Sequence, residues 1–419
     1  MANGFPTDTQ QKSQKPRNIK THNQRLVVGL LQQENVLPVT EVSDRIKLSK
    51  TSVTRILNDL VQKRLVRMDG KGKSTFEGGK RPELFSLNEK YAYFIVVHFG
   101  VSVLECALMD MKCTALERCG EEYADKSDFP QCFSQMVRCV ERLNETAKAL
   151  DGSVRCVAVG CQGIVDSGTG TLCYTAHSRW TKDIPLRDNL LAALSFKTQV
   201  VVENVCRFSG YAELLRKPEL AEELVVTITA ERTTGGCVLD HGVLALGTNG
   251  FVGEVGHMVM EPHFPKKCIC GGHGCFEMLV SPRALRDEAR AGIDRYPNSV
   301  LHAELEREAL TSEQIFEAAE TGDPLARHLM DRSAQYFSML IRNIILLCDP
   351  RIIVIQGLYA NAGTYFAERL RAMVVELPFF EIKQNLKIVY SPIDYFDSVF
   401  LGGAFLAANQ LLDNDSLYL

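Results

Sequence analysis

The sequence lacks any apolar run long enough to cross a membrane. No uninterrupted apolar stretch in its 419 residues approaches the roughly 18 residues that a membrane helix needs. Residues 1–20 are polar and lack the apolar segment of a secretory signal. These absences argue against membrane insertion and export, so we expect a cytoplasmic protein.

The composition also lacks the extremes that mark fibrous or disordered chains. Apolar residues make up 46% and charged residues 23%, which excludes a collagen-like or wholly disordered chain. No short repeat or low-complexity segment occurs beyond residues 1–20, which we expect to form a flexible polar tail. The chain is longer than one core usually organises, so two or three domains are expected.

The 14 cysteines do not follow the pattern of a disulfide framework. Eleven of them are scattered singly, several in apolar stretches, as with Cys106 and Cys156. In a long chain without an export signal, such residues are expected to be reduced thiols. The exception is a local cluster formed by Cys268, Cys270 and Cys275.

Charge is divided unevenly along the chain. Residues 1–90 hold 17 Lys and Arg against 9 Asp and Glu, whereas the remainder holds 30 against 42. A basic head is therefore joined to an acidic body, although the whole chain carries a net charge of only −4. Positive charge concentrated in one segment favours a polyanion as its partner, and a solvated basic face is the alternative.

Past the tail, the spacing of apolar residues predicts two helices. Apolar residues between Leu26 and Leu31 recur at helical spacing, and Pro38 then breaks the pattern. Thr40 is the expected N-cap of a second, short helix that runs to about Ile46.

A third helix is predicted to start after Ser49, which is an N-cap residue type. Its apolar residues at i, i+3, i+4, i+7 and i+8 form one face and are Val53, Ile56, Leu57, Leu60 and Val61. The opposite face and the N-terminal end, which would enter a major groove first, carry short polar or basic side chains. The candidate DNA-reading residues are Lys50, Thr51, Ser52, Thr54 and Arg55.

Two strands are expected after this helix, at residues 65–68 and 83–87, with a turn rich in Gly and Lys at 69–79. This turn and the residues after it form a basic wing that suits insertion beside a minor groove. The basic wing residues are Lys71, Lys73, Lys80 and Arg81, of which the last two are further candidate DNA contacts.

Three helices and a hairpin predict a winged helix-turn-helix domain over residues 21–88. Helical spacing, an N-cap, a polar outer face and a basic wing coincide with the positive charge, so we expect this domain to bind double-stranded DNA. The apolar spacing alone would also fit any small three-helix bundle.

From Tyr91 the composition changes to β-rich runs that alternate with amphipathic helices. Helices are predicted at Phe133–Leu150 and Pro324–Leu347, the second opened by Asp323 as a cap and by proline at its first position. This alternation predicts an α/β body of two lobes. The expected strands include residues 93–97, 154–159, 200–202, 224–228 and 352–355.

The strongest local signal is a set of metal-ligand residues formed by His257, Cys268, Cys270 and Cys275. One imidazole and three thiolates satisfy tetrahedral zinc, and the intervening glycines let three sulfurs reach one ion. Four protein ligands close the coordination shell, so the zinc is expected to be structural rather than catalytic. Free thiols in a mobile loop are the alternative.

The residues around this cluster resemble a known family. Residues 247–257 read Gly-Thr-Asn-Gly-Phe-Val-Gly-Glu-Val-Gly-His, and residues 268–277 read Cys-x-Cys-Gly-x-x-Gly-Cys-x-Glu. Together they resemble the signature of the ROK proteins, named for repressors, open reading frames and kinases. Further similar segments are 160–166, Trp180 with 184–186, and 349–357. The resemblance therefore covers nearly the whole chain after the tail, and it extends to the family's sugar-responsive repressors for N-acetylglucosamine, glucose and xylose.

The resemblance implies a two-lobed, actin-like or sugar-kinase-like fold of the ribonuclease H-like ATPase type behind the winged helix. The first α/β lobe would span residues 91–202 and be completed by a C-terminal helix at 399–413. The second would span residues 203–398 and carry the zinc loop and an oligomerisation surface.

The resemblance also implies a sugar site. In the family's kinases, sugar hydroxyls are held by residues that correspond here to Asn204, Glu254, His257 and Glu277. His257 can serve twice, because one ring nitrogen can bind zinc while the other donates to a hydroxyl. The alternative is that these residues only cap helices or support the zinc site.

The kinase half of the family pattern is broken in this chain. The family's catalytic base is an Asp directly after the Asn, whereas this chain has Val205, which cannot accept a proton. Both phosphate loops, at 98–102 and 230–236, have lost glycines that let backbone amides approach phosphate, and the adenosine-side glycines at 356–358 are also reduced.

The resemblance therefore predicts a DNA-binding transcriptional regulator, most simply a repressor of carbohydrate genes, with an inactive sugar-kinase-like sensor. Its expected partners are a double-stranded DNA operator, a sugar or sugar-phosphate effector and further copies of itself, as a homodimer or homotetramer. Two alternatives stay open at this point. One is a sugar kinase with an accessory domain, and the other is a regulator controlled by a protein partner.

Overall fold

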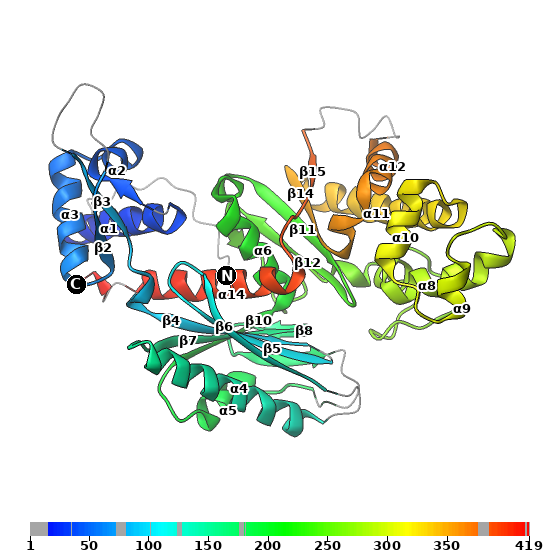
Figure 1. Ribbon diagram of the computed structural model, residues 1–419, viewed down its shortest axis with the longest axis horizontal. Helices are drawn as coiled ribbons and strands as arrows, with labels where there is room; N and C mark the ends of the chain where they lie inside the picture. Colours follow the sequence, from blue (N-terminus) through cyan, green and yellow to red (C-terminus); the bar gives the residue numbers. More distant parts are fainter. Residues whose placement is uncertain are drawn as a thin grey trace, which may run out of the picture.

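The computed structural model describes residues 16–34, 36–72, 81–100, 102–123, 128–175, 180, 182–375, 385–414 and 417–418. Figure 1 shows a small head at one end, a first lobe in the middle and a second lobe at the other end. Among the described helices, none is both long enough and apolar enough to cross a membrane.

The head is a three-helix bundle with a small antiparallel sheet. Its sheet has the strand order β1-β3-β2. The side chain of Ser49 accepts a hydrogen bond from the Ser52 amide at 3.2 Å, which confirms the predicted cap of the third helix. In chain order the elements are α1 (Pro16–Gln33), β1 (Leu37–Pro38), α2 (Val39–Ile46), α3 (Lys50–Gln62), β2 (Val66–Lys71) and β3 (Glu83–Leu87).

Three details of the head differ from the sequence prediction. Helix α1 begins at Pro16, so residues 16–20 of the expected tail are helical; proline suits a first turn because its missing N–H would have no helical partner there. Helix α2 begins directly after Pro38, and the predicted cap Thr40 lies inside its first turn. Strand β1 places Pro38 opposite Leu84 in the sheet, which fixes the entry to α2 two residues earlier than predicted. Strand β2 continues to Lys71, into the expected turn.

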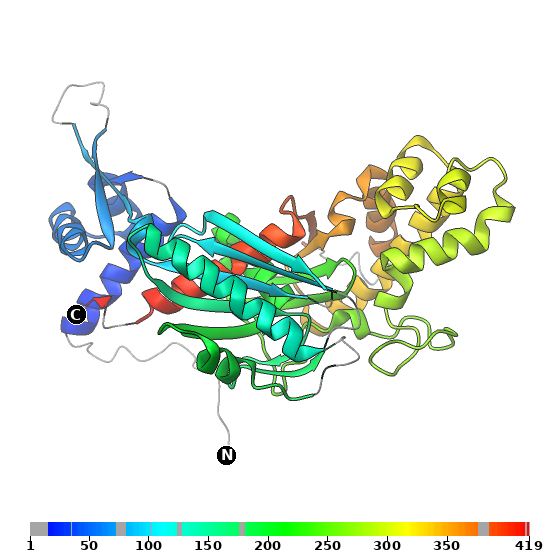
Figure 2. The ribbon, with the colours of Figure 1, turned by 60° about the horizontal axis from the view of Figure 1, so that its bottom comes forward.

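The first lobe is built on a five-stranded sheet with the order β10-β7-β4-β5-β6. Figure 2 shows α4 in front of this sheet and α14 behind it. Its elements are β4 (Tyr93–Phe99), β5 (Val103–Met109), β6 (Ala115–Glu122), α4 (Phe129–Ala149), β7 (Val154–Cys161), β8 (Gly163–Asp166), β9 (Thr171–Thr175), α5 (Leu186–Ala193), β10 (Gln199–Asn204) and α14 (Tyr395–Leu412).

The second lobe repeats this plan with a five-stranded sheet of order β13-β12-β11-β14-β15. Its apolar core packs under helices α8, α10, α11 and α12. Its elements are β11 (Leu224–Ala230), β12 (Thr234–Asp240), β13 (Val243–Leu244), α7 (Glu277–Val280), α8 (Pro282–Gly292), α9 (His302–Glu306), α10 (Ser312–Thr321), α11 (Pro324–Cys348), β14 (Ile352–Gly357), α12 (Gly363–Val375) and β15 (Lys387–Tyr390).

Helix α6 (Val205–Arg216) lies against α14 at the junction of the two lobes and contacts strands of both sheets. The two helices approach closely because Gly402 has no side chain: a Cβ there would lie 1.6 Å from the Phe208 carbonyl oxygen. The position of α6 relative to both lobes therefore depends on a contact between backbones.

Local signals placed the helices of the body with variable accuracy. Helix α11 begins as predicted, with the Asp323 side chain accepting from the Ala326 amide at 2.9 Å. Helix α4 begins at Phe129, four residues earlier than predicted, because Asp128 caps it and Pro130 suits its first turn. Helix α14 likewise begins at Tyr395, capped by Asp394, rather than at residue 399.

One apolar core connects the head to the first lobe. Buried residues of the head, such as Leu57 and Phe85, belong to the same cluster as Phe94 and Phe400 of the first lobe. Tyr418 is only 2% exposed within this cluster, and the Arg25 guanidinium lies 5.8 Å from its ring. The core of the second lobe is a separate cluster.

Candidate functional site

A pocket of about 310 Å³ lies between the two lobes. All four residues of the predicted sugar site line it, although they come from separate parts of the chain. The lining residues are Gln162, Gly163, Ile164, Tyr174, Asn204, Val205, Cys206, Thr233, Thr234, Gly235, Phe251, Glu254, His257, Ile269, Cys270 and Glu277.

Asn204 is held in place by three hydrogen bonds at the point where β10 ends and α6 begins. Its side-chain oxygen accepts from the Cys206 amide at 2.7 Å and caps α6. Its side-chain nitrogen donates to the Gly163 carbonyl at 2.8 Å and to Glu254 Oε1 at 3.4 Å. The cap role and the position on the pocket wall therefore coexist. The next residue, Val205, also faces the pocket.

Two carboxyl groups face the pocket from the second lobe. Glu277 is the first residue of α7, and its Oε2 accepts from the Thr234 amide at 2.6 Å. Burial raises the pKa of Glu254 to about 7, an effect that Arg207 opposes and Glu277 reinforces. Near neutral pH the Glu254 carboxyl is thus available both as an acceptor and as a donor, which suits a ligand with neighbouring hydroxyl groups.

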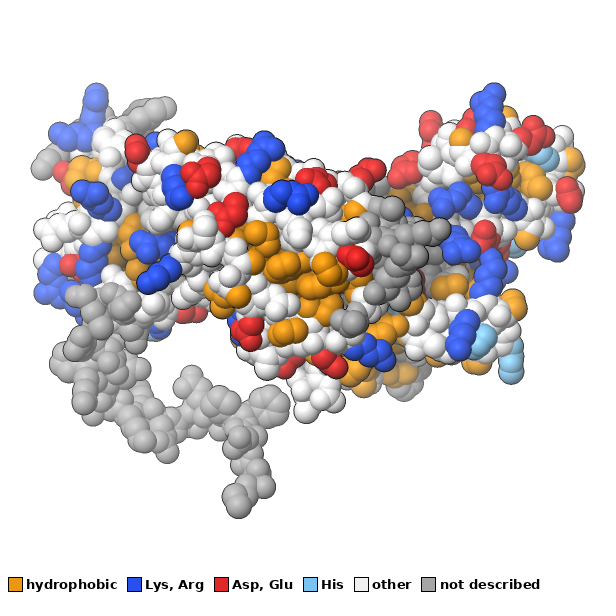
Figure 3. All heavy atoms as spheres, turned by 90° about the horizontal axis from the view of Figure 1, so that it is seen from below, with side chains coloured by type: hydrophobic (Ala, Val, Ile, Leu, Met, Phe, Trp, Pro, Cys, Tyr) orange, Lys and Arg blue, Asp and Glu red, His pale blue; other side chains and the backbone are white. Residues whose placement is uncertain are grey.

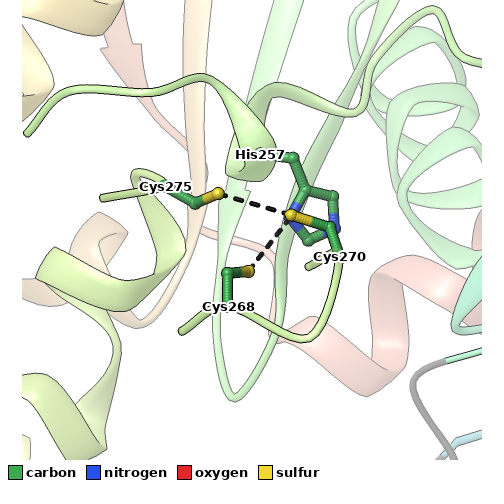
Figure 4. A group of neighbouring side chains, drawn as sticks. All are labelled: His257, Cys268, Cys270 and Cys275. Carbon is green, nitrogen blue, oxygen red and sulfur yellow. Dashed lines mark hydrogen bonds between the residues drawn. The ribbon is translucent and has the colours of Figure 1, made fainter. Parts of the chain in front are cut away.

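The predicted metal ligands come together beside the pocket. The ligand atoms of His257, Cys268, Cys270 and Cys275 all lie within 4.8 Å of one another, and Figure 4 shows the four side chains pointing toward one another. His257 Nδ1 lies 3.5 Å from Cys268 Sγ, and Cys270 Sγ lies 3.5 Å from Cys275 Sγ. Donors at 2.0–2.3 Å from one tetrahedral ion would be about 3.3–3.8 Å apart, so the geometry fits a four-coordinate metal.

The pocket and the metal cluster share two residues. His257 and Cys270 belong to the cluster and also line the pocket. Because His257 Nδ1 faces Cys268, its Nε2 is left for the pocket side. The α7 residue Glu277 follows Cys275 by two positions, so an ion in the cluster would fix that carboxylate as well.

A buried ion pair that the sequence analysis missed anchors the signature loop to the first lobe. Arg207 Nη1 lies 2.7 Å from Glu203 Oε1, and these side chains are only 2% and 5% exposed. Arg207 Nη2 donates to the Gly250 carbonyl at 2.7 Å, while Ser167 donates to Glu203 at 2.6 Å. The spacing of Glu203 and Arg207 at i and i+4 was the available signal, but it is also typical of exposed helix surfaces.

The two segments that the resemblance assigns to phosphate loops, 98–102 and 230–236, meet across the lobes. Arg232, in the turn between β11 and β12, donates to Ser102 Oγ at 2.8 Å, in the turn between β4 and β5. Burial raises the pKa of Glu231 to about 7 and lowers the pKa of His98 to about 4. His98 Nε2 and the Tyr395 hydroxyl are 3.3 Å apart. The Arg232–Ser102 hydrogen bond thus joins the two lobes at this place.

Helix α3 presents the predicted DNA-reading residues on an open face. Lys50, Thr51, Thr54 and Arg55 are exposed, and Ser52 is half-buried. The Thr54 hydroxyl donates to the Lys50 carbonyl at 2.8 Å, which fixes its rotamer. Figure 3 shows Lys and Arg side chains gathered at the end of the molecule that carries the head. An exposed polar helix face within positive charge is typical of a major-groove reader.

The wing is described only in part. Arg81 is exposed, and Lys71 ends β2 on the same hairpin. Lys73 and Lys80, both expected in the wing, lie outside the described residues. The DNA contact of Lys80 therefore stays a prediction from the sequence.

The fold and the site define a class of protein: a two-lobed, sugar-kinase-like body that carries a winged helix-turn-helix head. Residues 94–410 match the model of the ROK family, and residues 27–70 match that of the IclR helix-turn-helix domain. The chain belongs to the ROK family.

Known relatives divide according to how much of the chain they match. A xylose repressor of Caldicellulosiruptor bescii is 24% identical over 383 residues, which cover 90% of this chain and 92% of that protein. A glucokinase of Thermotoga maritima is 28% identical over 256 residues, which cover 61% of this chain and 80% of the enzyme. Of these two relatives, the repressor is the one matched over nearly the whole chain.

A solved structure of a regulator also matches nearly the whole chain. The crystal structure of a ROK family transcriptional regulator, described as a homologue of the Escherichia coli MLC protein, superposes with a TM-score of 0.76 at 25% identity. The superposition covers 96% of this chain and 98% of that regulator.

Proposed function

We propose that this protein is a sugar-responsive transcriptional repressor whose body binds a carbohydrate and does not phosphorylate it. One observation carries the proposal: Asn204, Glu254, His257 and Glu277 line a single pocket in a chain that also presents an exposed polar helix of the helix-turn-helix type. Paired donors and acceptors on neighbouring hydroxyls discriminate sugars well, because a ligand that lacks a hydroxyl leaves a buried polar group unpaired.

The proposed metal is one structural Zn²⁺ per chain, held by His257, Cys268, Cys270 and Cys275. Three thiolates and one imidazole match the ligand preference of zinc, and four protein ligands leave no open position for chemistry. The role of the ion is to hold the loop that ends in α7, and with it the Glu277 carboxylate, against the pocket.

The absence of catalysis is proposed from the residues that replace a catalytic base and an anion cradle. Val205 lines the pocket beside Asn204, and an isopropyl group cannot take a proton from a sugar hydroxyl. Glu231, which follows β11, would carry negative charge toward a phosphate when ionised. The Arg232–Ser102 hydrogen bond joins the lobes at the same place.

The mechanism that we propose is a shift between two arrangements of the lobes. A dimer would place two copies of α3 on half-sites about 34 Å apart, and the sugar would favour the arrangement in which this spacing no longer fits. The ligand must bind the two arrangements with different affinities, since equal binding shifts nothing. The pocket can supply this difference because Asn204 comes from the first lobe, whereas Glu254 and Glu277 come from the second.

The decisive experiment selects an operator from random-sequence DNA with the full chain and then titrates the complex with a panel of free and phosphorylated sugars. The proposal expects one sugar class to change operator affinity at least about tenfold, which is about 1.4 kcal/mol. ADP release with the same panel should stay far below the ordinary enzyme rate of about 1 per second. Turnover at that rate would replace the repressor by a sugar kinase with an accessory domain.

A matched variant tests the pocket directly. Glu277→Gln keeps an oxygen that can accept from the Thr234 amide but removes the ionisable group. We expect sugar affinity by calorimetry to fall about tenfold or more, because a hydrogen bond to a charged group is worth about 1.5–3 kcal/mol. Operator affinity without sugar should stay unchanged. An unaltered sugar titration would remove Glu277 from the binding residues.

One observation favours a second candidate, a regulator controlled by a protein partner. Val205 stands where the resembled kinases have an Asp, so the pocket wall lacks the polar group that this Asp would supply. If calorimetry detects no binding of any free or phosphorylated sugar while operator binding is intact, the partner-controlled regulator replaces the sugar-responsive one.

A further inference from the structure

A second group of cysteines lies in the first lobe, far in sequence from the proposed zinc ligands. The sulfur atoms of Cys106, Cys119 and Cys139 all lie within 4.8 Å of one another. Cys106 on β5 and Cys119 on β6 are directly opposite each other in the antiparallel pair. Cys139 comes from α4, which covers this face of the sheet.

The surroundings of this trithiol group combine an apolar base with a charged rim. Cys106 is fully buried, Cys139 is 7% exposed, and both belong to the apolar core under α4. Cys119 is half-buried on β6, which is an edge strand of the sheet and gives access from solvent. The proposed site is therefore closed on one side and reachable on the other.

Two ion pairs bridge the helix and the edge strand on either side of Cys119. Arg142 Nη2 lies 2.9 Å from Glu117 Oε1, and Arg138 Nη2 lies 3.7 Å from Glu121 Oε2. Both arginines are mostly exposed, so these pairs add little stability. Their positive charge lies at the rim of the group and would partly balance the negative charge of metal-bound thiolates.

The donor set decides which ion fits. Three sulfurs bound to one ion at about 2.3 Å in a plane would lie about 4.0 Å apart, so the described positions need to close by less than about 1 Å. Among the described residues, the group contains no His, Asp or Glu ligand atom. Zinc takes four ligands, whereas soft thiolates alone select a soft ion such as Cu(I).

We propose that Cys106, Cys119 and Cys139 form a second metal site, which binds one Cu(I) ion through three thiolate sulfurs. Three sulfur atoms from two adjacent strands and the covering helix converge on one point. Binding would release the thiol protons to water and would tie α4 to the edge of the sheet.

The test uses the full chain with its zinc content measured, titrated with Cu(I) under argon against bicinchoninate as the competing chelator. The wild-type protein should take one Cu(I) per chain without releasing zinc. Cys119→Ser and Cys139→Ser should each weaken this binding at least about 100-fold, since even the loss of an indirect partner of a metal costs 10–100-fold. X-ray absorption at the copper edge should show three sulfur neighbours.

The matched control is Cys348→Ser, which removes a partly buried thiol at the end of α11 and should leave Cu(I) binding unchanged. Operator binding and the thermal midpoint of each variant report whether it is folded; Cys119 is half-buried, so its serine variant is the one expected to keep both. Equal Cu(I) binding by wild-type and Cys119→Ser protein would overturn the proposal. Release of one zinc for each copper taken up would also overturn it, because the ion would then have entered the His257 cluster.

Discussion

The two lobes have the same plan but different attachments. Each contains a five-stranded sheet, yet the first lobe shares one apolar core with the head, whereas the core of the second lobe is separate. The second lobe instead carries the candidate metal ligands and both carboxyl groups of the pocket. The head and the first lobe therefore form one packed unit. Any movement of the second lobe would be relative to this whole unit.

The largest effect on stability is expected from removing the buried Arg207 ion pair, which links the signature loop to the first lobe. Arg207→Met leaves the Glu203 carboxylate buried without its partner and frees the Gly250 carbonyl, so we expect unfolding to be easier by about 3–5 kcal/mol in urea titrations. The double variant Glu203→Gln with Arg207→Met should recover much of this loss, because no unpaired charge remains. A single variant as stable as wild type would mean that the pair does not hold the signature loop.

A smaller effect should be confined to the second lobe. Cys268→Ala removes one of four metal ligands, and we expect zinc affinity to fall at least about 100-fold, or about 2.8 kcal/mol. Zinc content by elemental analysis and the thermal midpoint should drop together. The head should be spared, so operator affinity at low temperature is the internal control. Full zinc content in the variant would contradict the ligand assignment.

An effect confined to the head is expected from Arg55→Ala. Arg55 is exposed on α3 and makes no ion pair among the described residues, so its guanidinium is available to a base edge or a phosphate. We expect operator binding to weaken by about 1–3 kcal/mol, with relaxed base preference if it reads a guanine. Sugar affinity should not change. Gel shifts equal to wild type would remove Arg55 from the readout.

The smallest effect tests how local the head's stability is. Ser49→Ala removes the side-chain cap of α3, which typically costs about 1 kcal/mol. Amide hydrogen exchange should speed up in the first turn of α3 and leave the second lobe unaffected. The control is Thr51→Ala, because Thr51 lies in the same first turn of α3 but does not cap the helix. Equal exchange in both variants would show that the cap contributes nothing.

Local features of the fold were predictable from sequence because their causes are local. The caps Ser49 and Asp323 lie within three residues of the amides that they accept from, and the α11 start followed directly. Thr40 failed as a cap because the pairing of Pro38 with Leu84, far along the chain, set the start of α2. Other wrong boundaries have local causes, since α4 and α14 begin earlier than predicted, at the caps Asp128 and Asp394.

The candidate site divides in the same way. The candidate metal residues and Glu254, His257 and Glu277 could be predicted because the signature keeps them at fixed spacing between residues 247 and 277, whereas Asn204 came from the wider resemblance. The buried Glu203–Arg207 pair was missed because only the fold shows that it is 2–5% exposed. The Cys106–Cys119–Cys139 group was missed because strand register and helix packing, rather than spacing, bring its members together.

Cys270 belongs at once to the metal cluster and to the wall of the pocket. If the proposed ion is bound there, its removal would loosen that wall of the pocket. In a cell that lacks the metal or is exposed to a thiol oxidant, sugar binding would then weaken before DNA binding does. The response to sugar would thus depend on the metal content of the cell, because the Cys270 sulfur serves both sites.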